Sequence, residues 1–190
     1  ASVRRPAGNP GNGIQPKDQL VIYDVDDILS FPQRNDAGVV IEDDIVMKAG
    51  RYAIGIYLTP GTAEISSNSD GETDAEGYTP SVKFNHPGNE QEIREFKTNW
   101  LSKKCIVVLR YCSGKPADLI GTPCNPCKLS VSYTGSNESN TNELTFTQIS
   151  KGDDIAIYRG TDTLEEPVAV VEAGATDIDY LSLIHISEPT

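Results

Sequence analysis

The chain has 190 residues, of which 37% are hydrophobic, and its formal net charge is −12 at pH 7. This length and composition predict a single globular domain that can bury its own core. The acidic balance argues against a surface that grips nucleic acid, because such binding depends on Lys and Arg side chains that neutralise phosphates, and it argues equally against docking on an anionic membrane. No apolar run approaches the roughly 20 residues that a membrane-spanning helix needs.

The chain begins with a segment that we expect to stay outside the folded core. Residues 1–16 are rich in Pro and Gly and show no apolar periodicity. Such a composition favours an extended or disordered lead-in over a packed element. We therefore expect residues 1–19 to form an extended N-terminal arm and residues 20–180 to form one domain.

Short runs of β-branched and aromatic residues, separated by turn-forming residues, predict β-strands from Leu20 onward. The run from Cys105 to Cys112 is too continuously apolar for an exposed strand, so we expect it to be central and buried on both faces. The predicted strands lie within Leu20–Tyr23, Gly38–Ile41, Asp44–Met47, Arg51–Leu58, Cys105–Cys112, Cys127–Tyr133, Leu144–Ile149 and Ile155–Arg159.

A polar segment interrupts these strands at about residues 65–79. It consists mainly of Ser, Asp, Gly and Glu and has almost nothing to bury. Loops of this length in a compact domain are usually functional or disordered. We therefore predict a long polar loop here and expect it to serve contacts with a partner.

One amphipathic helix is predicted at about residues 89–101. Asn89 stands where an N-cap residue is expected, and Glu92 follows three residues later, which approximates a capping box. A single apolar stripe with helical spacing follows, and its width suits a helix that covers a sheet. The stripe consists of Ile93, Phe96, Trp100 and Leu101.

These elements together predict the fold class. Nine or so short strands and one helix are typical of a mainly β, α+β protein. We expect an antiparallel β-sandwich or a partly closed β-barrel with one flanking α-helix at about residues 89–101.

The four cysteines leave a metal site open as an alternative. Cys105 and Cys112 are seven residues apart on one predicted strand, so their side chains should point to opposite faces. A zinc site from Cys112, Cys124 and Cys127 is conceivable, since structural zinc is held by thiolates. The simpler interpretation is two buried thiols that pack as small apolar groups and two thiols in turns. We therefore expect no bound metal.

The sequence offers little for catalysis. His86 is the one histidine before residue 181, so neither a two-histidine metal site nor a well-supported Ser-His-Asp triad can be assembled. No G-x-S-x-G, P-loop or G-x-G-x-x-G pattern is present. We expect a protein that is not an enzyme, with no catalytic or cofactor-binding residues and no cofactor.

Residues 92–160 resemble the tail tube, or major tail, proteins of phages that infect Bacteroidetes-type bacteria. The resemblance rests on the order and spacing of short motifs and covers about a third of the chain. The motifs are Asn99-Trp100-Leu101, Tyr111-Cys112-Ser113-Gly114, Leu119 to Pro126, Asn142-Glu143-Leu144-Thr145-Phe146 and Ile157-Tyr158-Arg159-Gly160.

This resemblance implies a structural virion protein that is assembled in the cytoplasm of the bacterial host. Such subunits form homo-oligomeric six-fold rings, which stack through loops and terminal arms together with other phage tail proteins. DNA passes through the lumen without specific binding, and no membrane contact is implied. An acidic chain suits this role, because its charge repels phosphate.

Two other functions compete with the tail tube. The first is another virion role, in a head–tail connector or a baseplate, because these components share related β-folds. The second is an exported adhesin-like or carbohydrate-binding β-sandwich module, which a signal peptide upstream of Ala1 would favour.

The last ten residues, 181–190, resemble an in-frame translation of a sequencing adapter, which suggests an assembled metagenomic read. We expect them to be a non-native tail that makes no systematic core contacts. Deleting residues 181–190 should therefore leave the melting temperature of the purified protein unchanged within error. A clear fall in melting temperature in a thermal scan would show that the segment is a genuine part of the fold.

Overall fold

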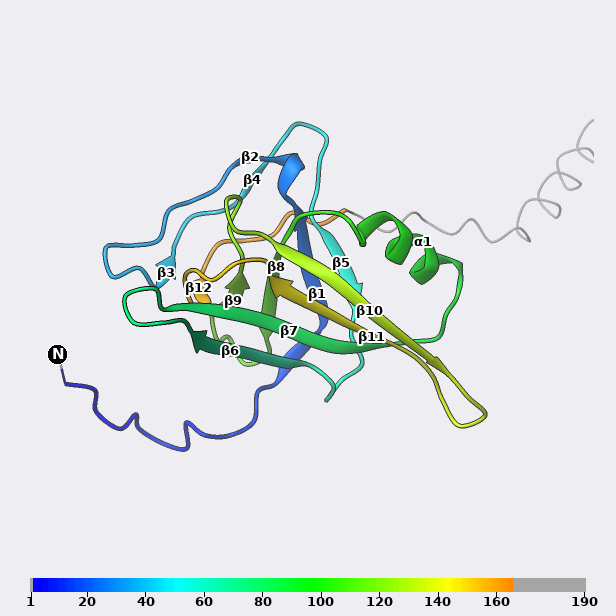
Figure 1. The fold of residues 1–190 in the computed structure, drawn as a ribbon, viewed down its shortest axis with the longest axis horizontal. Helices are drawn as coiled ribbons and strands as arrows, with labels where there is room; N and C mark the ends of the chain where they lie inside the picture. The colour runs from blue at the N-terminus through cyan, green and yellow to red at the C-terminus, as the bar shows by residue number, and fades with distance from the viewer. Residues whose placement is uncertain (1, 166–190) are drawn as a thin grey trace, which may run out of the picture.

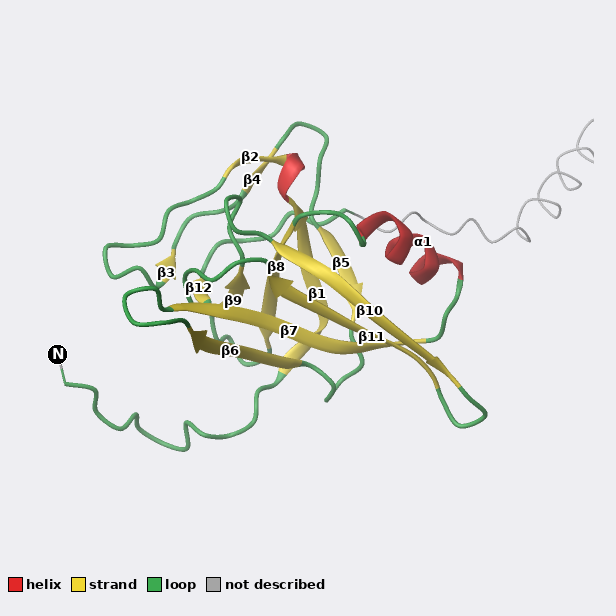
Figure 2. Cartoon of the chain, viewed as in Figure 1, coloured by secondary structure: helices red, strands yellow, loops and turns green. Residues whose placement is uncertain are grey.

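The structure is a computed structural model, and it describes residues 2–165 of the chain. Within these residues the protein is mostly β, with 45% of them in strands, and one α-helix flanks the sheets (Figure 2), as the sequence predicted. The expected non-native tail at 181–190 and the end of the expected domain at 166–180 lie outside the described residues.

The strands range from two to eleven residues, so several are longer than the dispersed β-branched runs predict. The α-helix of the described part, α1 (Gln91–Trp100), follows the longest strand, and a 3-10 turn, η1 (Val25–Asp27), follows the first strand. The strands within residues 2–165 are β1 (Pro16–Asp24), β2 (Ile28–Ser30), β3 (Val40–Ile41), β4 (Val46–Met47), β5 (Ile54–Tyr57), β6 (Glu64–Asp70), β7 (Gly77–Pro87), β8 (Cys105–Tyr111), β9 (Ala117–Ile120), β10 (Cys127–Gly135), β11 (Asn140–Gln148) and β12 (Ala156–Tyr158).

Strand β8 is the branch point of the large sheet (Figure 1). One of its edges pairs with β1, and β1 in turn pairs with β5. Because a strand has only two edges, β9 and β10 share the other one. β9 pairs with residues 107–109 and leads on to β12 and β3, whereas β10 pairs at Cys105 and leads on to β11, β7 and β6. The contact of β12 with β3 is parallel, so the sheet is mixed.

Residues 20–24 of β1 and 105–109 of β8 are buried on both faces, which confirms the prediction for the first five residues of the Cys105–Cys112 run, whereas Cys112 is exposed past the end of β8. Alternate residues of a strand point to opposite sides, so these strands serve two apolar cores. Val107 and Leu109 belong to a core that β7, β10, β11 and α1 cover. Ile106 and Val108 belong to a second core, which contains Leu119 of β9 and Tyr158 of β12.

The helix begins later than the sequence predicted. Glu90 occupies the N-cap position without a side-chain cap bond, so the expected capping box from Asn89 is wrong. Instead, the Asn89 side chain accepts a hydrogen bond from Lys97 Nζ at 2.8 Å. Ile93 and Trp100 are buried, whereas Leu101 is 54% exposed and does not face the sheet. Leu101 lies just past the last helical residue, and its side chain faces solvent instead of continuing the buried apolar stripe.

Two predicted boundaries need correction. The segment expected to be a long loop at 65–79 is mostly a hairpin, because residues 64–70 form β6 and pair in register with residues 77–83 of β7. Only residues 71–76 remain as the turn. Backbone pairing stabilises this polar stretch, which an argument from apolar burial alone overlooks. The N-terminal arm is also shorter than expected, because residues 16–19 already belong to β1.

Replacing Trp100 with Ala should cost about 3–5 kcal/mol of unfolding free energy, because a large side chain leaves the core. Trp100 is only 5% exposed, stacks on Phe96 with ring centroids 5.7 Å apart, and lies under Lys103 Nζ. Urea denaturation would measure the loss. The matched control is Leu101→Ala in the next position, which should change stability by less than about 0.5 kcal/mol. Equal losses for the two variants would contradict this placement of the helix.

Candidate interaction surfaces

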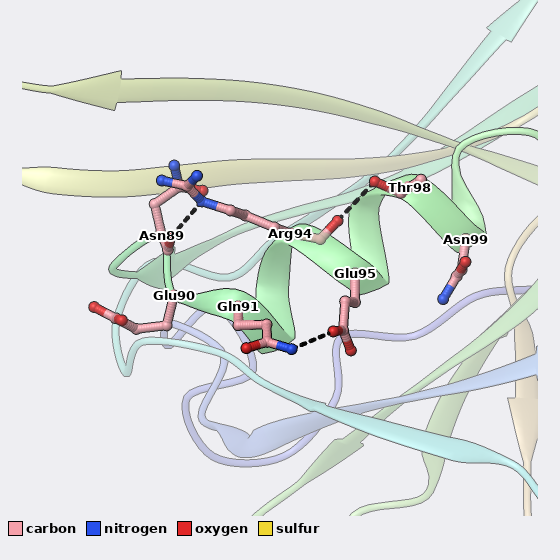
Figure 3. A pocket seen from close by; sticks show the side chains of 7 residues that line it. All are labelled: Asn89, Glu90, Gln91, Arg94, Glu95, Thr98 and Asn99. Carbon is pink, nitrogen blue, oxygen red and sulfur yellow. Dashed lines mark hydrogen bonds between the residues drawn. The ribbon is translucent and has the colours of Figure 1, made fainter.

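A hollow of about 530 Å³ runs along the exposed side of α1 (Figure 3). Its side chains are polar, and several of them bond to one another. Gln91 Nε2 donates to Glu95 Oε1 at 2.7 Å, and Arg94 Nε donates to the carbonyl of Asn89 at 2.7 Å. All the lining residues belong to the helix or the two residues before it, so the hollow has no opposing wall. It is better described as a solvated helix face than as a ligand site.

The one described histidine has a structural environment. His86 Nδ1 lies 2.9 Å from the carbonyl oxygen of Tyr57, so this nitrogen donates the hydrogen bond. The two rings meet edge to face at 6.2 Å. His86 thus joins the end of β7 to the end of β5, and the described residues bring no nucleophile to its ring.

The four cysteines divide into two buried thiols and two exposed thiols. Cys105 and Cys127 face each other across β8 and β10, both without exposed surface, and Cys105 Sγ donates to the Cys127 carbonyl at 3.3 Å. Cys112 and Cys124 are exposed. The three thiols proposed for zinc are therefore not brought together. Among residues 2–165, no group of three or more His, Cys, Asp or Glu residues is placed to hold a metal.

A partly buried polar cluster closes the second core, and nothing in the sequence pattern had singled it out. The carboxylate of Asp162 accepts hydrogen bonds from the Tyr23 hydroxyl and from Arg110 Nε. Arg110 also donates to the carbonyl of Gly160 at 2.7 Å and lies over the ring of Tyr158 at 5.5 Å. Burial, and then the adjacent Asp162 carboxylate, raise the pKa of Tyr23 above its ordinary value. The cluster ties the chain after β12 to β1 and β8.

The tip of the β6–β7 hairpin, residues 71–76, projects an acidic turn from the body. Glu72, Asp74 and Glu76 are all exposed. The turn has a fixed shape, because Gly71 has φ of 141° and a Cβ there would lie 2.3 Å from the carbonyl oxygen of Ala75. Its base is held by the paired backbone hydrogen bonds between Tyr78 and Gly152 at 2.9 and 3.0 Å. The tip therefore offers a preformed polar surface that contributes nothing to the core.

Strand β6 ends the sheet on this side. Within the described residues it is paired with β7 alone, so its outer edge carries backbone donors and acceptors with no strand partner. Native edges are commonly blunted by Pro, by bulges or by shortness, and β6 is seven residues long with an unbroken register and no Pro. An edge of this kind can accept a further strand by backbone pairing.

The N-terminal arm, residues 2–15, is exposed along its whole length (Figure 1). Its hydrogen bonds are a local turn at Asn9 to Asn12 and one bond at its end, from the Cys112 N–H to the Gln15 carbonyl at 2.9 Å. The arm contains Arg4 and Arg5 and no acidic residue, in contrast with the acidic chain as a whole. It is a tether with its own charge, attached directly to β1.

Comparisons of the chain with protein-family models, with curated proteins and with solved structures found no match. In the part of the chain that the structure describes, no helix is long and apolar enough to cross a membrane. A functional proposal therefore has to rest on the arm, the hairpin tip and the edge of β6.

The buried cysteine pair generates a prediction about alkaline stability. Burial raises the pKa of Cys105 from an ordinary 9.0 to about 12, and burial likewise raises the pKa of Cys127. A group whose pKa is higher in the folded state stabilises the fold below its unfolded pKa, and this contribution disappears as the pH rises through the folded value. The unfolding free energy of the reduced protein should therefore fall between pH 9 and pH 12.

Urea denaturation in the presence of a reductant would measure this decline. Cys105→Ala should make the decline shallower, because the titrating thiol is gone. Cys112→Ala is the matched control, since its thiol is exposed, and it should leave the slope unchanged. The same slope in wild type and Cys105→Ala would show that this thiol does not couple to folding.

Proposed function

We propose that the chain is a non-enzymatic structural subunit that assembles with copies of itself, and that the assembly is a bacteriophage tail tube. The observation that supports this most directly is the outer edge of β6, a seven-residue strand at the end of the large sheet. The hollow along α1, in contrast, has no opposing wall against which a substrate could be held. Assembly through backbone edges and projecting segments suits these surfaces better than substrate turnover does.

Within a ring, the proposed contact is strand addition at β6. A neighbouring subunit that pairs with this edge would satisfy its outward N–H and C=O groups and would continue the sheet from one subunit to the next. If each subunit is related to the next by the same rotation, these head-to-tail contacts close into a ring. Six-fold symmetry is the expectation that the resemblance to tail tube proteins brings.

Between rings, the proposed contacts are the acidic tip at residues 71–76 and the arm at residues 2–15. Both are exposed and polar. The tip is already held by its hairpin, whereas fixing the arm costs about 1–2 kcal/mol per residue in backbone entropy. A partner that buries such a segment offsets this cost. The arm carries only positive side-chain charges and the tip carries only negative ones, so their contact across stacked rings would be electrostatically favourable.

The charge of the chain also supports this role. A net charge of −12 gives a surface that repels phosphate at short range. A channel lined by such subunits would let DNA move without retention, because tight binding requires cationic side chains that release counterions.

The experiment replaces residues 71–76 with Asn-Gly. Asp70 and Gly77 face each other in the register, so a two-residue turn can connect them without disturbing β6 or β7. Removing residues 66–76 would be a poorer test, because residues 66–70 belong to β6. The shortened variant should keep the far-UV circular dichroism of the wild type but should not form tubes in electron micrographs.

The matched control shortens the other hairpin in the same way. Residues 136–139 connect Gly135 and Asn140, which are also paired, so Asn-Gly can replace them. This variant should form tubes as the wild type does. Normal polymerisation of the 71–76 variant would remove the tip from the interface. A wild-type protein that stays monomeric in sedimentation at high concentration would overturn the tail tube proposal, and connector, baseplate or carbohydrate-binding roles would then be preferred.

A further inference from the structure

The two branches that share one edge of β8 separate directly after Cys105. β10 is paired with β8 only through Cys127 and Cys105, and from residue 107 onward the same edge belongs to β9. The whole branch of β10, β11, β7 and β6 therefore joins the centre of the sheet through one residue pair in the backbone register. A covalent bond at this pair would have a larger structural effect than a bond elsewhere in the sheet.

The geometry of the pair suits a disulfide. Directly opposed residues of antiparallel strands have Cα atoms about 4.5–5.5 Å apart and side chains on the same face, and disulfides span about 4.4–6.8 Å between Cα atoms. Both side chains belong to the same core, and Cys105 Sγ lies 3.3 Å from the carbonyl oxygen of Cys127. The sulfur atoms thus share one side of the β8–β10 contact.

Gly121 leaves room for this pair. Its φ of 92° favours glycine, and a Cβ at this position would lie only 3.1 Å from Cys127 Sγ. The neighbouring C-x-x-C partner is turned away. Cys124 is exposed in a turn that two backbone hydrogen bonds close between Thr122 and Asn125, each 3.1 Å long. Cys127 therefore faces Cys105 in the core, while Cys124 faces solvent.

We propose that Cys105 and Cys127 are a disulfide site that forms when the chain folds in the presence of a small-molecule disulfide such as oxidised glutathione. One cysteine thiolate attacks the glutathione disulfide, which releases one glutathione thiolate and leaves a mixed disulfide. The second cysteine loses its proton and attacks the protein sulfur of that mixed disulfide, which releases the second glutathione. Two thiols are oxidised to one disulfide, and one oxidised glutathione is reduced to two thiols.

The disulfide forms during folding and not afterwards, because both thiols lack exposed surface in the folded structure. Thiolate is the reactive form, and the raised pKa of both buried thiols slows attack once the core has closed. The site does not depend on tube formation. It applies to the isolated subunit and to any assembly of it.

The test refolds the full chain from denaturant with oxidised and reduced glutathione, blocks remaining thiols by alkylation and digests with trypsin. Cleavage after Lys104 and Arg110 places Cys105 in a peptide of its own, 105–110. The other three cysteines lie in 111–128, because trypsin does not cut between Lys115 and Pro116. Mass spectrometry should find these two peptides linked, with the loss of two hydrogen atoms.

A variant with Cys112→Ser and Cys124→Ser identifies the partner, since it retains only Cys105 and Cys127. It should give the same linked peptides, and additional replacement of Cys105 with Ala should abolish them. The bond closes a loop of 22 residues, so the oxidised protein should melt roughly 6–12 °C above the reduced one. Circular dichroism would confirm that each variant folds.

Two results would overturn the proposal. In the first, the double variant is folded and treated with glutathione, and all of its peptide 105–110 is then recovered in the alkylated form. The other is a disulfide in the wild-type protein that joins only cysteines within 111–128, which would place the reactive pair among Cys112, Cys124 and Cys127 and leave Cys105 reduced.

Discussion

The fold depends on one strand, β8, which contributes side chains to two apolar cores and pairs with three neighbouring strands. β8 is buried on both faces, and its two edges serve β1, β9 and β10. A strand buried in this way has no tolerance for a polar residue on either side, which explains the uninterrupted apolar run from Cys105 to Leu109. Because β9 and β10 divide one edge, the sheet must split there. The two cores, the helix that covers one of them and the polar cluster that closes the other all follow from this division.

The polar parts of the chain are kept apart from these cores and gathered on the periphery. The arm, the tip at residues 71–76 and the outer edge of β6 contribute little apolar burial, although the hairpin base at Tyr78 is held in place. A body with well-packed cores and a hairpin tip held at its base presents the same contact surface in every copy. Such pre-organisation lowers the entropic cost of association, and this is the physical reason to look for a partner rather than a substrate.

Sequence patterns predicted the features that depend on apolar burial. The central strand, the helix with Ile93 and Trp100 facing inward, and the mainly β class all followed from periodicity and composition. β6 was missed because its stability comes from backbone pairing with β7, which leaves no apolar signal in a run such as Ser66 to Asp70. The contacts of Cys105 with Cys127 and of Arg110 with Asp162 were also beyond reach, because each pair is brought together by the branching of the sheet. Of the three candidate surfaces, the exposed arm and the polar tip lie in segments that the sequence singled out, whereas the edge of β6 was not foreseen.

The attachment of the arm to β1 has a mechanical consequence. β1 is paired along one edge with β5 and along the other with β8, and the arm continues directly from its first residue, Pro16. Hydrogen bonds between antiparallel strands lie perpendicular to the strand direction. A pull on the arm along the axis of β1 therefore loads both rows of bonds together in shear, whereas a pull across the strand would break them one after another. A tether fixed in this way can transmit tension to the middle of the domain while the domain stays folded.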